Sequence, residues 1–323
     1  MPDRLLEGKI ALVTGAGRGI GEAHARRLAA YGAKVVVNDT GVAIDGSATE
    51  ETPADEVVAA IIAGGSEAVT DGHDISTMDG GAAAVQKAID TWGRIDIVVN
   101  HAGIGRPKMV FNLEEEDWDD VIRVHLKGTF AVSREACRFW RSEGKAGREG
   151  YGRIVNTATG LLQMGGAGQS NYVAAKAGCA AFTAAIAQEM EQYGVTANAI
   201  MPGARTRMAN VGWRTAANAE KAEFKGWDAQ SPDHVAELVC YLASPAADWI
   251  SGQCFQVGGI RIDHTLAWLP RAELRKENAG WTAPELVKAM PKFFAGPKAN
   301  ELPPKEWAEA RKAAQSKADG FAG

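Results

Sequence analysis

Hydrophobic residues follow two alternating patterns along residues 1–260. Short, continuous runs rich in Val and Ile predict strands at 9–14, 33–39, 67–74, 94–100, 152–159, 195–203 and 252–259. Longer amphipathic or alanine-rich runs predict helices at 19–32, 54–65, 81–93, 117–141, 170–193 and 232–243. Strands without polar alternation are typical of a parallel sheet covered on both faces. With right-handed crossovers, the pattern predicts an α/β fold built on a doubly wound parallel sheet.

Three segments fall outside this alternation. Residues 40–53 form a long polar loop, and residues 204–231 are a weakly patterned stretch that we expect to be a substrate lid. Residues 263–323 read as a C-terminal extension. Because no linker divides the rest, we expect residues 1–262 to form a single domain.

Composition narrows the function without defining it. Hydrophobic residues make up 46% and charged residues 23%, as in ordinary globular proteins, and the formal net charge is −5. This charge argues against nucleic acid or an anionic membrane as the main partner. There is no 18-residue apolar run, and the start of the chain does not resemble a signal peptide. The four cysteines lack disulfide or metal-ligand spacing, so we expect a cytoplasmic protein with no metal site.

The stretch TGAGRGIG, residues 14–21, lies between a predicted strand and a predicted helix. Its glycines allow a tight turn and a close backbone approach to a pyrophosphate, and the helix start supplies amide donors. We therefore expect a dinucleotide to contact Gly15, Arg18, Gly19, Ile20 and Gly21.

Asp39, which ends the second predicted strand, bears on the choice of cofactor. A carboxylate there accepts hydrogen bonds from ribose hydroxyls and repels a 2′-phosphate, which favours NAD over NADP. Arg18 argues in the opposite direction because it could meet that phosphate. Further polar or glycine clusters follow the later strands, and we expect them to line the same crevice: Asp74, Ile75, Asn100, Ala102, Gly103, Pro202, Gly203 and Thr206.

The stretch NYVAAK places Tyr172 and Lys176 one helical turn apart, so the two side chains share a face. In one interpretation, Lys176 is a solvated lysine beside a core tyrosine. In the other, its ammonium lowers the pKa of Tyr172 so that the phenol can act as a base near neutral pH.

Taken together, TGAGRGIG, Asp39, Asp74, NHAG and YVAAK resemble the short-chain dehydrogenase/reductase family over about residues 8–260. That family has a single-domain Rossmann fold and a nicotinamide cofactor. VHLKG, VVNDTG and GQSNYVAAKAG further resemble the (3R)-hydroxyacyl-CoA dehydrogenase units of multifunctional β-oxidation enzymes, and related actinobacterial dehydrogenases. The second asparagine of the family's NNAG motif is replaced by His101, at a position that mainly supports the central strand.

The resemblance implies catalytic roles for four residues. Tyr172 is the base, and Lys176 lowers its pKa and holds the nicotinamide ribose. Thr159 stands where the family usually has serine and keeps the hydroxyl that orients the substrate oxygen; Thr157 is a fallback donor that we expect to face away. His125 stands where the family has an asparagine, and it either supports a proton relay or only packs and hydrogen-bonds locally.

The resemblance also implies an NAD(P)-dependent oxidoreductase that interconverts a secondary alcohol and a ketone. We expect an apolar pocket for a bulky hydrophobic alcohol or ketone, with Leu161, Met164, Met208 and Trp213 among its lining. Arg205, Arg207 and Arg214 either meet a CoA phosphate or are simply solvated. Small residues along helix 170–193 predict close helix packing, within the subunit or across the axis of a homodimer or homotetramer.

Three alternatives to an NAD-dependent alcohol dehydrogenase follow. The substrate could be a (3R)-hydroxyacyl-CoA. The protein could be an NADPH-dependent 3-oxoacyl reductase. It could also be a nucleotide sensor without turnover, against which the intact Tyr/Lys pair argues.

Overall fold

The computed structural model describes residues 4–47, 52–148, 150–163, 165–205, 227–265 and 281–293. Within these residues, eight strands form one sheet in the order β3-β2-β1-β4-β5-β6-β7-β8. They are β1 (Ile10–Thr14), β2 (Lys34–Asn38), β3 (Ala68–Asp71), β4 (Ile97–Asn100), β5 (Gly152–Thr157), β6 (Val195–Pro202), β7 (Cys254–Gly258) and β8 (Arg261–Thr265). Every pairing is parallel except that of β7 with β8.

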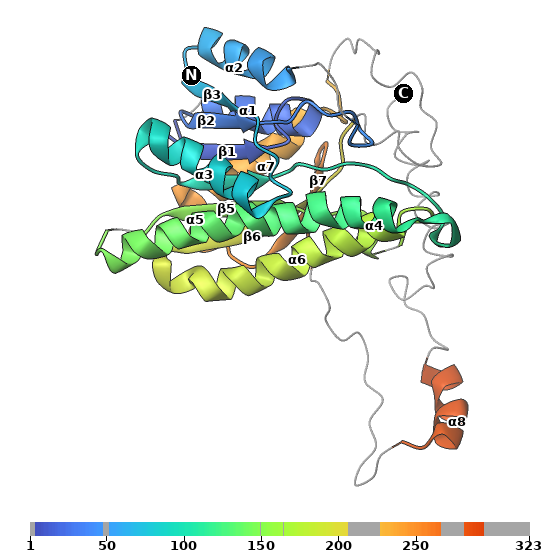
Figure 1. Ribbon diagram of the computed structural model, residues 1–323. Coiled ribbons are helices and arrows are strands. Elements are labelled where there is room, and N and C mark those ends of the chain that lie inside the picture. The colour runs from blue at the N-terminus through green and yellow to red at the C-terminus, as the bar shows by residue number, and fades with distance from the viewer. Residues whose placement is uncertain are drawn as a thin grey trace. The chain divides into compact units, whose positions relative to one another are not determined.

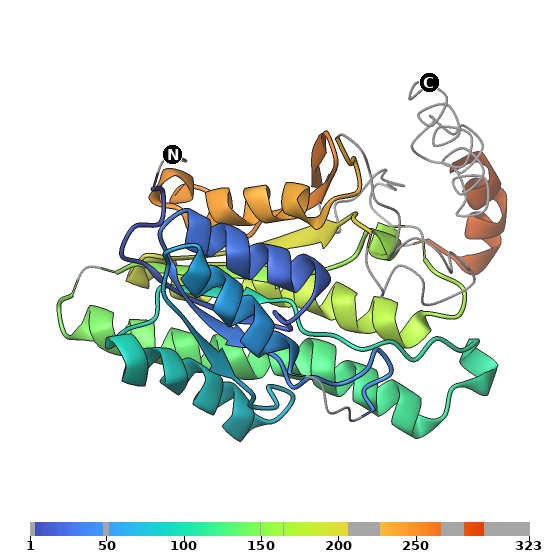
Figure 2. The same cartoon turned by 90° about the horizontal axis from the view of Figure 1, so that it is seen from above.

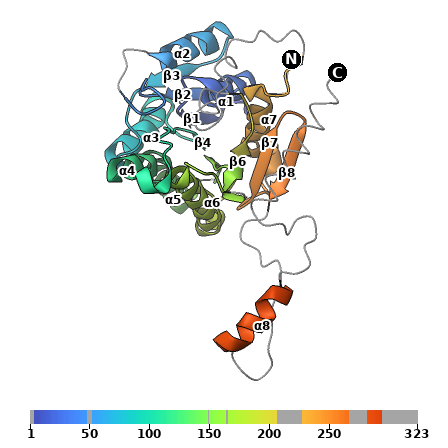
Figure 3. The ribbon, with the colours of Figure 1, turned by 90° about the vertical axis from the view of Figure 1, so that its right-hand side faces the viewer.

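Helices cover both faces of this sheet, as the end-on view shows (Figure 3). On one face lie α1 (Gly19–Ala30), α2 (Pro53–Ala63) and α7 (Pro232–Ala243). On the other lie α3 (Met78–Trp92), α5 (Gly128–Lys145) and α6 (Ser170–Met190), with α5 and α6 running side by side in Figure 1. The helices α1 and α7 lie together over the sheet in Figure 2. The central strands β1 and β4 are therefore buried throughout, which explains their uninterrupted apolar sequences.

The predicted α/β doubly wound fold is confirmed, but one predicted helix is divided. Residues predicted as a helix at 117–141 form α4 (Glu115–Ile122), a π-helical turn (Arg123–Lys127) and α5. The backbone continues without a break, so the apolar periodicity alone could not reveal the extra residue per turn. Single π-helical turns occur often at functional sites, and this one carries His125.

Strand β8 is absent from the sequence prediction. It pairs antiparallel with β7 through a two-residue turn at Gly259 and Ile260, where Gly259 has a φ of 55°. Its sequence, RIDHT, is short, largely polar and mostly exposed at the sheet edge. Such a strand lacks the apolar run that identifies the buried strands.

By contact density the chain divides into two units, Met1–Leu162 with Gly166–Ala267, and Gln163–Gly165 with Trp268–Gly323. The first unit holds the whole sheet. The second holds α8 (Ala283–Phe293), whereas the first residues of the predicted C-terminal extension, 263–265, belong to β8 in the first unit. Among the helices described, none has the length and apolar character needed to cross a bilayer.

Candidate active site

The residues singled out from the sequence follow the carboxyl ends of the parallel strands, where open α/β sheets bind their ligands. The strand ends carry a row of polar residues in register: Thr14 pairs with Asn38 and Asn100, and Asn100 pairs with Asn156. Thr14 Oγ1 accepts hydrogen bonds from the backbone amides of His101 (3.0 Å) and Ala102 (3.2 Å). The loop after β4 is thereby fastened to the end of β1.

The loop between β1 and α1 has room for backbone but not for side chains. Gly15 and Gly19 have φ values of 63° and 58°, in the left-handed region that favours glycine. A Cβ on Gly15 would lie 2.6 Å from Ala102 Cα, and one on Gly21 would lie 2.0 Å from Gly15 O. Arg18 is the N-cap of α1 and makes no side-chain cap to the helix amides. This is the arrangement that a pyrophosphate requires, so the loop fits a dinucleotide.

Asp39 lies beside the glycine loop, as expected for a residue that accepts hydrogen bonds from the adenosine ribose. Its Oδ2 accepts a hydrogen bond from the amide of Gly17 (2.9 Å), and its Oδ1 accepts one from the amide of Gly41 (2.8 Å). The carboxylate therefore also holds two loops in place, a role that sequence reasoning did not anticipate.

The remaining cofactor candidates occupy different environments. The carboxylate of Asp74 is half-exposed, accepts from Ser76 N (3.0 Å) and lies 3.6 Å from the guanidinium of Arg123. Ile75 is buried against the Cα of Gly128, where an added Cβ would lie 2.3 Å from Ile75 Cδ1. Gly203 continues β6, and its amide donates to Val257 O at 2.7 Å.

Asn100 is turned into the protein. Its Nδ2 donates to Ser133 Oγ (2.9 Å) and to Asn156 Oδ1 (2.8 Å), so its side chain ties β4 to β5 and α5. The next residue, His101, places Nδ1 3.1 Å from Thr157 Oγ1 and so bridges the same two strands. This agrees with the predicted supporting role of His101, and it commits Thr157 to the strand rather than to a substrate.

Tyr172 and Lys176 lie in the first two turns of α6, and the hydroxyl of Tyr172 interacts with that of Thr159. Thr159 follows the end of β5 and is nearly buried, and Lys176 is 3% exposed inside the protein. Lys176 is therefore not a solvated surface lysine. Burial and, after it, the charge of Lys176 lower the pKa of both His101 and His125.

The pKa of Tyr172 differs in direction from the sequence prediction. Burial raises the pKa of Tyr172 above its ordinary value, and an interaction with the Thr159 hydroxyl lowers it. Burial also lowers the pKa of Lys176. The lowering that we predicted for Tyr172 is thus not produced by these side chains alone, because desolvation outweighs the hydrogen bond with Thr159.

His125 packs edge-on against Tyr172, with ring centroids 5.3 Å apart. Its Nε2 lies 2.8 Å from Ile104 O and 3.1 Å from Ile104 N, so it binds Ile104 in either tautomer. Its Nδ1 has no partner among the described residues. Burial and the charge of Lys176 lower the pKa of His125 to about 3, so the ring is neutral. The local hydrogen bonding that was one predicted role of His125 is present. Its other predicted role, in a proton relay, stays a prediction.

Only part of the predicted substrate pocket can be described. Leu161 is half-buried on a 3₁₀ turn (Gly160–Gln163) that follows Thr159. Met164, Thr206, Met208 and Trp213 lie outside the described residues, as do Arg207 and Arg214. Arg205 makes a two-point contact with Asp228 (3.0 and 3.1 Å), which directs its guanidinium toward a carboxylate.

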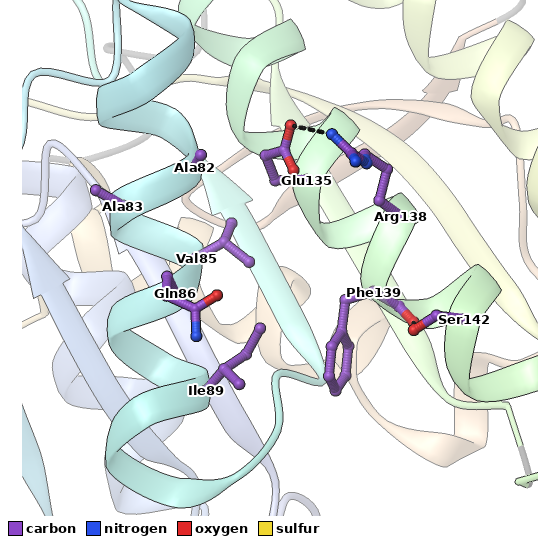
Figure 4. A pocket seen from close by; sticks show the side chains of 9 residues that line it. All are labelled: Ala82, Ala83, Val85, Gln86, Ile89, Glu135, Arg138, Phe139 and Ser142. Atoms are coloured by element: carbon purple, nitrogen blue, oxygen red, sulfur yellow. Dashed lines mark hydrogen bonds and ion pairs between the residues drawn. The ribbon is translucent and has the colours of Figure 1, made fainter. Parts of the chain in front are cut away.

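A separate groove of about 510 Å³ lies between α3 and α5, away from the strand ends (Figure 4). Val85, Ile89 and Phe139 form its apolar part, and Glu135 and Arg138 pair with each other at one end. The two charged side chains of this groove, Glu135 and Arg138, therefore neutralise each other. The described residues contain no group of His, Cys, Asp or Glu side chains that could hold a metal.

Two buried polar residues were missed by sequence reasoning. Asn171 lies beside Tyr172 and is fully hydrogen-bonded, and His24 is completely buried in α1 against His101, with ring centroids 5.4 Å apart. Both lie in helices where a polar residue predicts a solvated face, so the sequence offered no signal of their burial.

A doubly wound sheet, a dinucleotide loop and a partly buried Tyr172 one helical turn from the buried Lys176 define a nicotinamide-dependent dehydrogenase or reductase. The family model described as short chain dehydrogenase matches residues 9–217, and the chain belongs to that family. It is thus an NAD(P)-dependent oxidoreductase acting on hydroxyl and keto groups.

Two relatives indicate the branch of the family. The chain is 42% identical to the hydroxyacyl-CoA dehydrogenase ChsB1 of Mycobacterium tuberculosis, over 90% of both chains. It is 37% identical to the mouse peroxisomal multifunctional enzyme type 2, over 87% of this chain and 36% of the much longer enzyme. The predicted kinship with (3R)-hydroxyacyl-CoA dehydrogenases is confirmed.

Two solved structures of short-chain dehydrogenases are similar to this chain. A short-chain dehydrogenase from Mycobacterium avium has a TM-score of 0.80 and 43% identity, covering 91% of this chain and 97% of its own. One from Burkholderia cenocepacia, solved in complex with NADP, has a TM-score of 0.67 and 31% identity, covering 79% of this chain and 98% of its own.

Proposed function

We propose that this protein is an NAD-dependent dehydrogenase of 3-hydroxyacyl-CoA thioesters. The observation that carries the proposal is the match along nearly the full length of both chains to a hydroxyacyl-CoA dehydrogenase, combined with the partly buried Tyr172 and the buried Lys176 on one face of α6. We therefore favour an acyl-CoA thioester as the substrate over the free hydrophobic alcohol that the apolar residues suggest.

The chain's own residues carry the proton chemistry. Tyr172, in its phenolate form, takes the proton of the substrate hydroxyl, and Thr159 hydrogen-bonds the same oxygen and so orients it. A bound nicotinamide supplies the hydride acceptor and, when oxidised, a positive charge that favours the phenolate. Lys176 stabilises that phenolate from one turn away, and His125 packs against the ring of Tyr172 while its Nε2 binds Ile104.

The substrate is tested by following NADH formation with both enantiomers of 3-hydroxyacyl-CoA thioesters and with free secondary alcohols. We expect turnover of the (R)-thioesters, with kcat/KM for free alcohols lower by about 10²-fold or more, because binding energy from remote parts of a substrate raises kcat. Turnover confined to free alcohols would contradict the proposal.

The choice of NAD over NADP rests on Asp39, whose carboxylate lies against the glycine loop. Arg18 and the NADP-bound neighbour favour an NADP-dependent 3-oxoacyl reductase as the second candidate. Wild-type protein assayed with both cofactors in both directions separates the two, since a large preference for NADPH would reject our assignment.

Replacing Asp39 by Asn should shift cofactor preference. Removal of the negative charge weakens repulsion of the 2′-phosphate and the hydrogen bonds to the ribose, so the ratio of kcat/KM for NAD to that for NADP should fall about tenfold to a hundredfold. Asp45→Asn is the matched control, because Asp45 is exposed in the following loop and bonds Ser47. An unchanged ratio in Asp39→Asn would show that Asp39 serves only to hold the loops.

We also propose that the protein forms a homo-oligomer through α6. On α6, Ala174, Ala181 and Ala185 are exposed, whereas Gly178 packs against Leu126. The exposed small residues support a homodimer or homotetramer that pairs this helix across an axis. Sedimentation equilibrium measures it directly.

A further inference from the structure

Asn171 precedes Tyr172 in α6 and is 1% exposed. Its Oδ1 accepts a hydrogen bond from the amide of Tyr172 (2.8 Å). Its Nδ2 donates to Arg106 O (3.1 Å) and to Asp117 O (3.0 Å). One amide therefore joins the catalytic helix to the loop after β4 and to α4, with both N–H groups and the oxygen in use.

The loop that Asn171 holds is fixed at successive residues beside the site. The Nε2 of His125 binds either the amide or the carbonyl of Ile104, according to its tautomer, and the amide of Gly105 donates to Ile44 O (2.8 Å). The carbonyl of Arg106 is bound by Asn171, and its guanidinium pairs with Asp120 of α4 (3.0 Å). The segment Ile104–Arg106 is thus held by His125 at one end and by Asn171 at the other, and both of these residues contact Tyr172.

The pattern requires an amide rather than another polar group. A carboxylate or hydroxyl could accept from the amide of Tyr172, but neither supplies two N–H donors for two buried carbonyls. Buried carbonyls that lose their donors are costly, so the loop and the helix start would shift to find water or new partners. Reaction rates depend on the position of a base to within about 1 Å.

We propose that Asn171 is a positioning residue, which sets the place of the Tyr172 hydroxyl relative to the loop Ile104–Arg106. This inference rests on the proposed function, because it takes Tyr172 to be the base. Asn171 itself touches neither proton nor hydride.

The test compares Asn171→Asp and Asn171→Ser with Asn198→Asp. Asn198 is a matched control: it is also 1% exposed, it donates to Ile250 O (2.8 Å), and it accepts from Gln253 N (3.1 Å), but it lies in β6 away from the Tyr/Lys pair. We measure the melting temperature, kcat and KM on the acyl-CoA panel, and amide hydrogen exchange by mass spectrometry.

Both Asn171 variants should lower kcat about tenfold to a hundredfold with a smaller change in KM, since the base is displaced. They should also speed exchange at residues 104–108 and 170–173. Asn198→Asp should lower the melting temperature comparably and keep kcat within about twofold of wild type. If Asn171→Asp does not fold, Asn171→Ser decides alone, because its hydroxyl can still cap the amide of Tyr172.

Wild-type kcat in both Asn171 variants would overturn the inference. If wild-type protein turns over no member of the panel, the proposed function fails instead. Hydrogen exchange then decides on Asn171 by itself, and unchanged exchange at 104–108 and 170–173 would overturn the positioning role.

Discussion

Replacing Tyr172 by Phe is expected to lower kcat by about 10³-fold and to leave NADH binding unchanged. The variant keeps the ring that packs edge-on against His125, so the site retains its shape. It loses only the hydroxyl that exchanges a proton with the substrate. Turnover is measured from NADH absorbance, and cofactor affinity from titration of NADH fluorescence.

Tyr151→Phe is the matched control for this variant. Tyr151 precedes β5 at the opposite end of the sheet, and its hydroxyl donates to Ala243 O (2.5 Å). Loss of that hydrogen bond should cost about 1 kcal/mol of stability and leave kcat unaltered. If Tyr172→Phe retained wild-type turnover, the base would have to be another group. If it retained only a biological response that depends on NAD binding, the sensor alternative would gain support.

The cofactor end of the site was predictable because its constraints are local. Gly15 and Gly21 are required where backbone atoms approach so closely that a Cβ would collide, and that requirement leaves a fixed spacing in the sequence. Tyr172 and Lys176 are likewise one helical turn apart, so their shared face follows from spacing alone.

The substrate end was not predictable in the same way. The hydrogen bonds of Asn171 join residues 54 and 65 positions apart, and no local pattern records such pairs. The π-helical turn at His125 looks like ordinary helix in sequence. The direction of the Tyr172 pKa also depends on burial, which is a property of the assembled fold.

Three buried histidines in and beside this site, His24, His101 and His125, have lowered pKa values. Burial and the charge of Lys176 lower the pKa values of His101 and His125 to about 3. Burial lowers the pKa of His24 well below its ordinary value, and His101 adds to this effect. Both ring nitrogens of His24 lack hydrogen-bond partners among the described residues. The fold therefore keeps these rings uncharged, and that requirement links stability to pH.

In the unfolded chain the same histidines titrate at about pH 6.5. Below that pH the unfolded state therefore binds more protons than the folded state. The stability due to neutral rings is fully present above that pH and is lost as pH falls toward 3. In that window His101 and His125 each contribute a slope of about 1.4 kcal/mol per pH unit, and His24, whose pKa is also lowered, contributes a slope of the same sign.

Replacing His24 by Leu should therefore reduce the loss of stability in acid by about 1.4 kcal/mol per pH unit. The substitution breaks no hydrogen bond of the described residues, and it places an apolar side chain in the buried site. The free energy of unfolding, measured by urea denaturation between pH 7 and pH 5, gives both slopes. His264→Leu is the control, because His264 is exposed on β8 and should leave the slope as it is. Equal slopes for wild type and His24→Leu would contradict the prediction, because the ring of His24 would then be protonated in the folded protein as well.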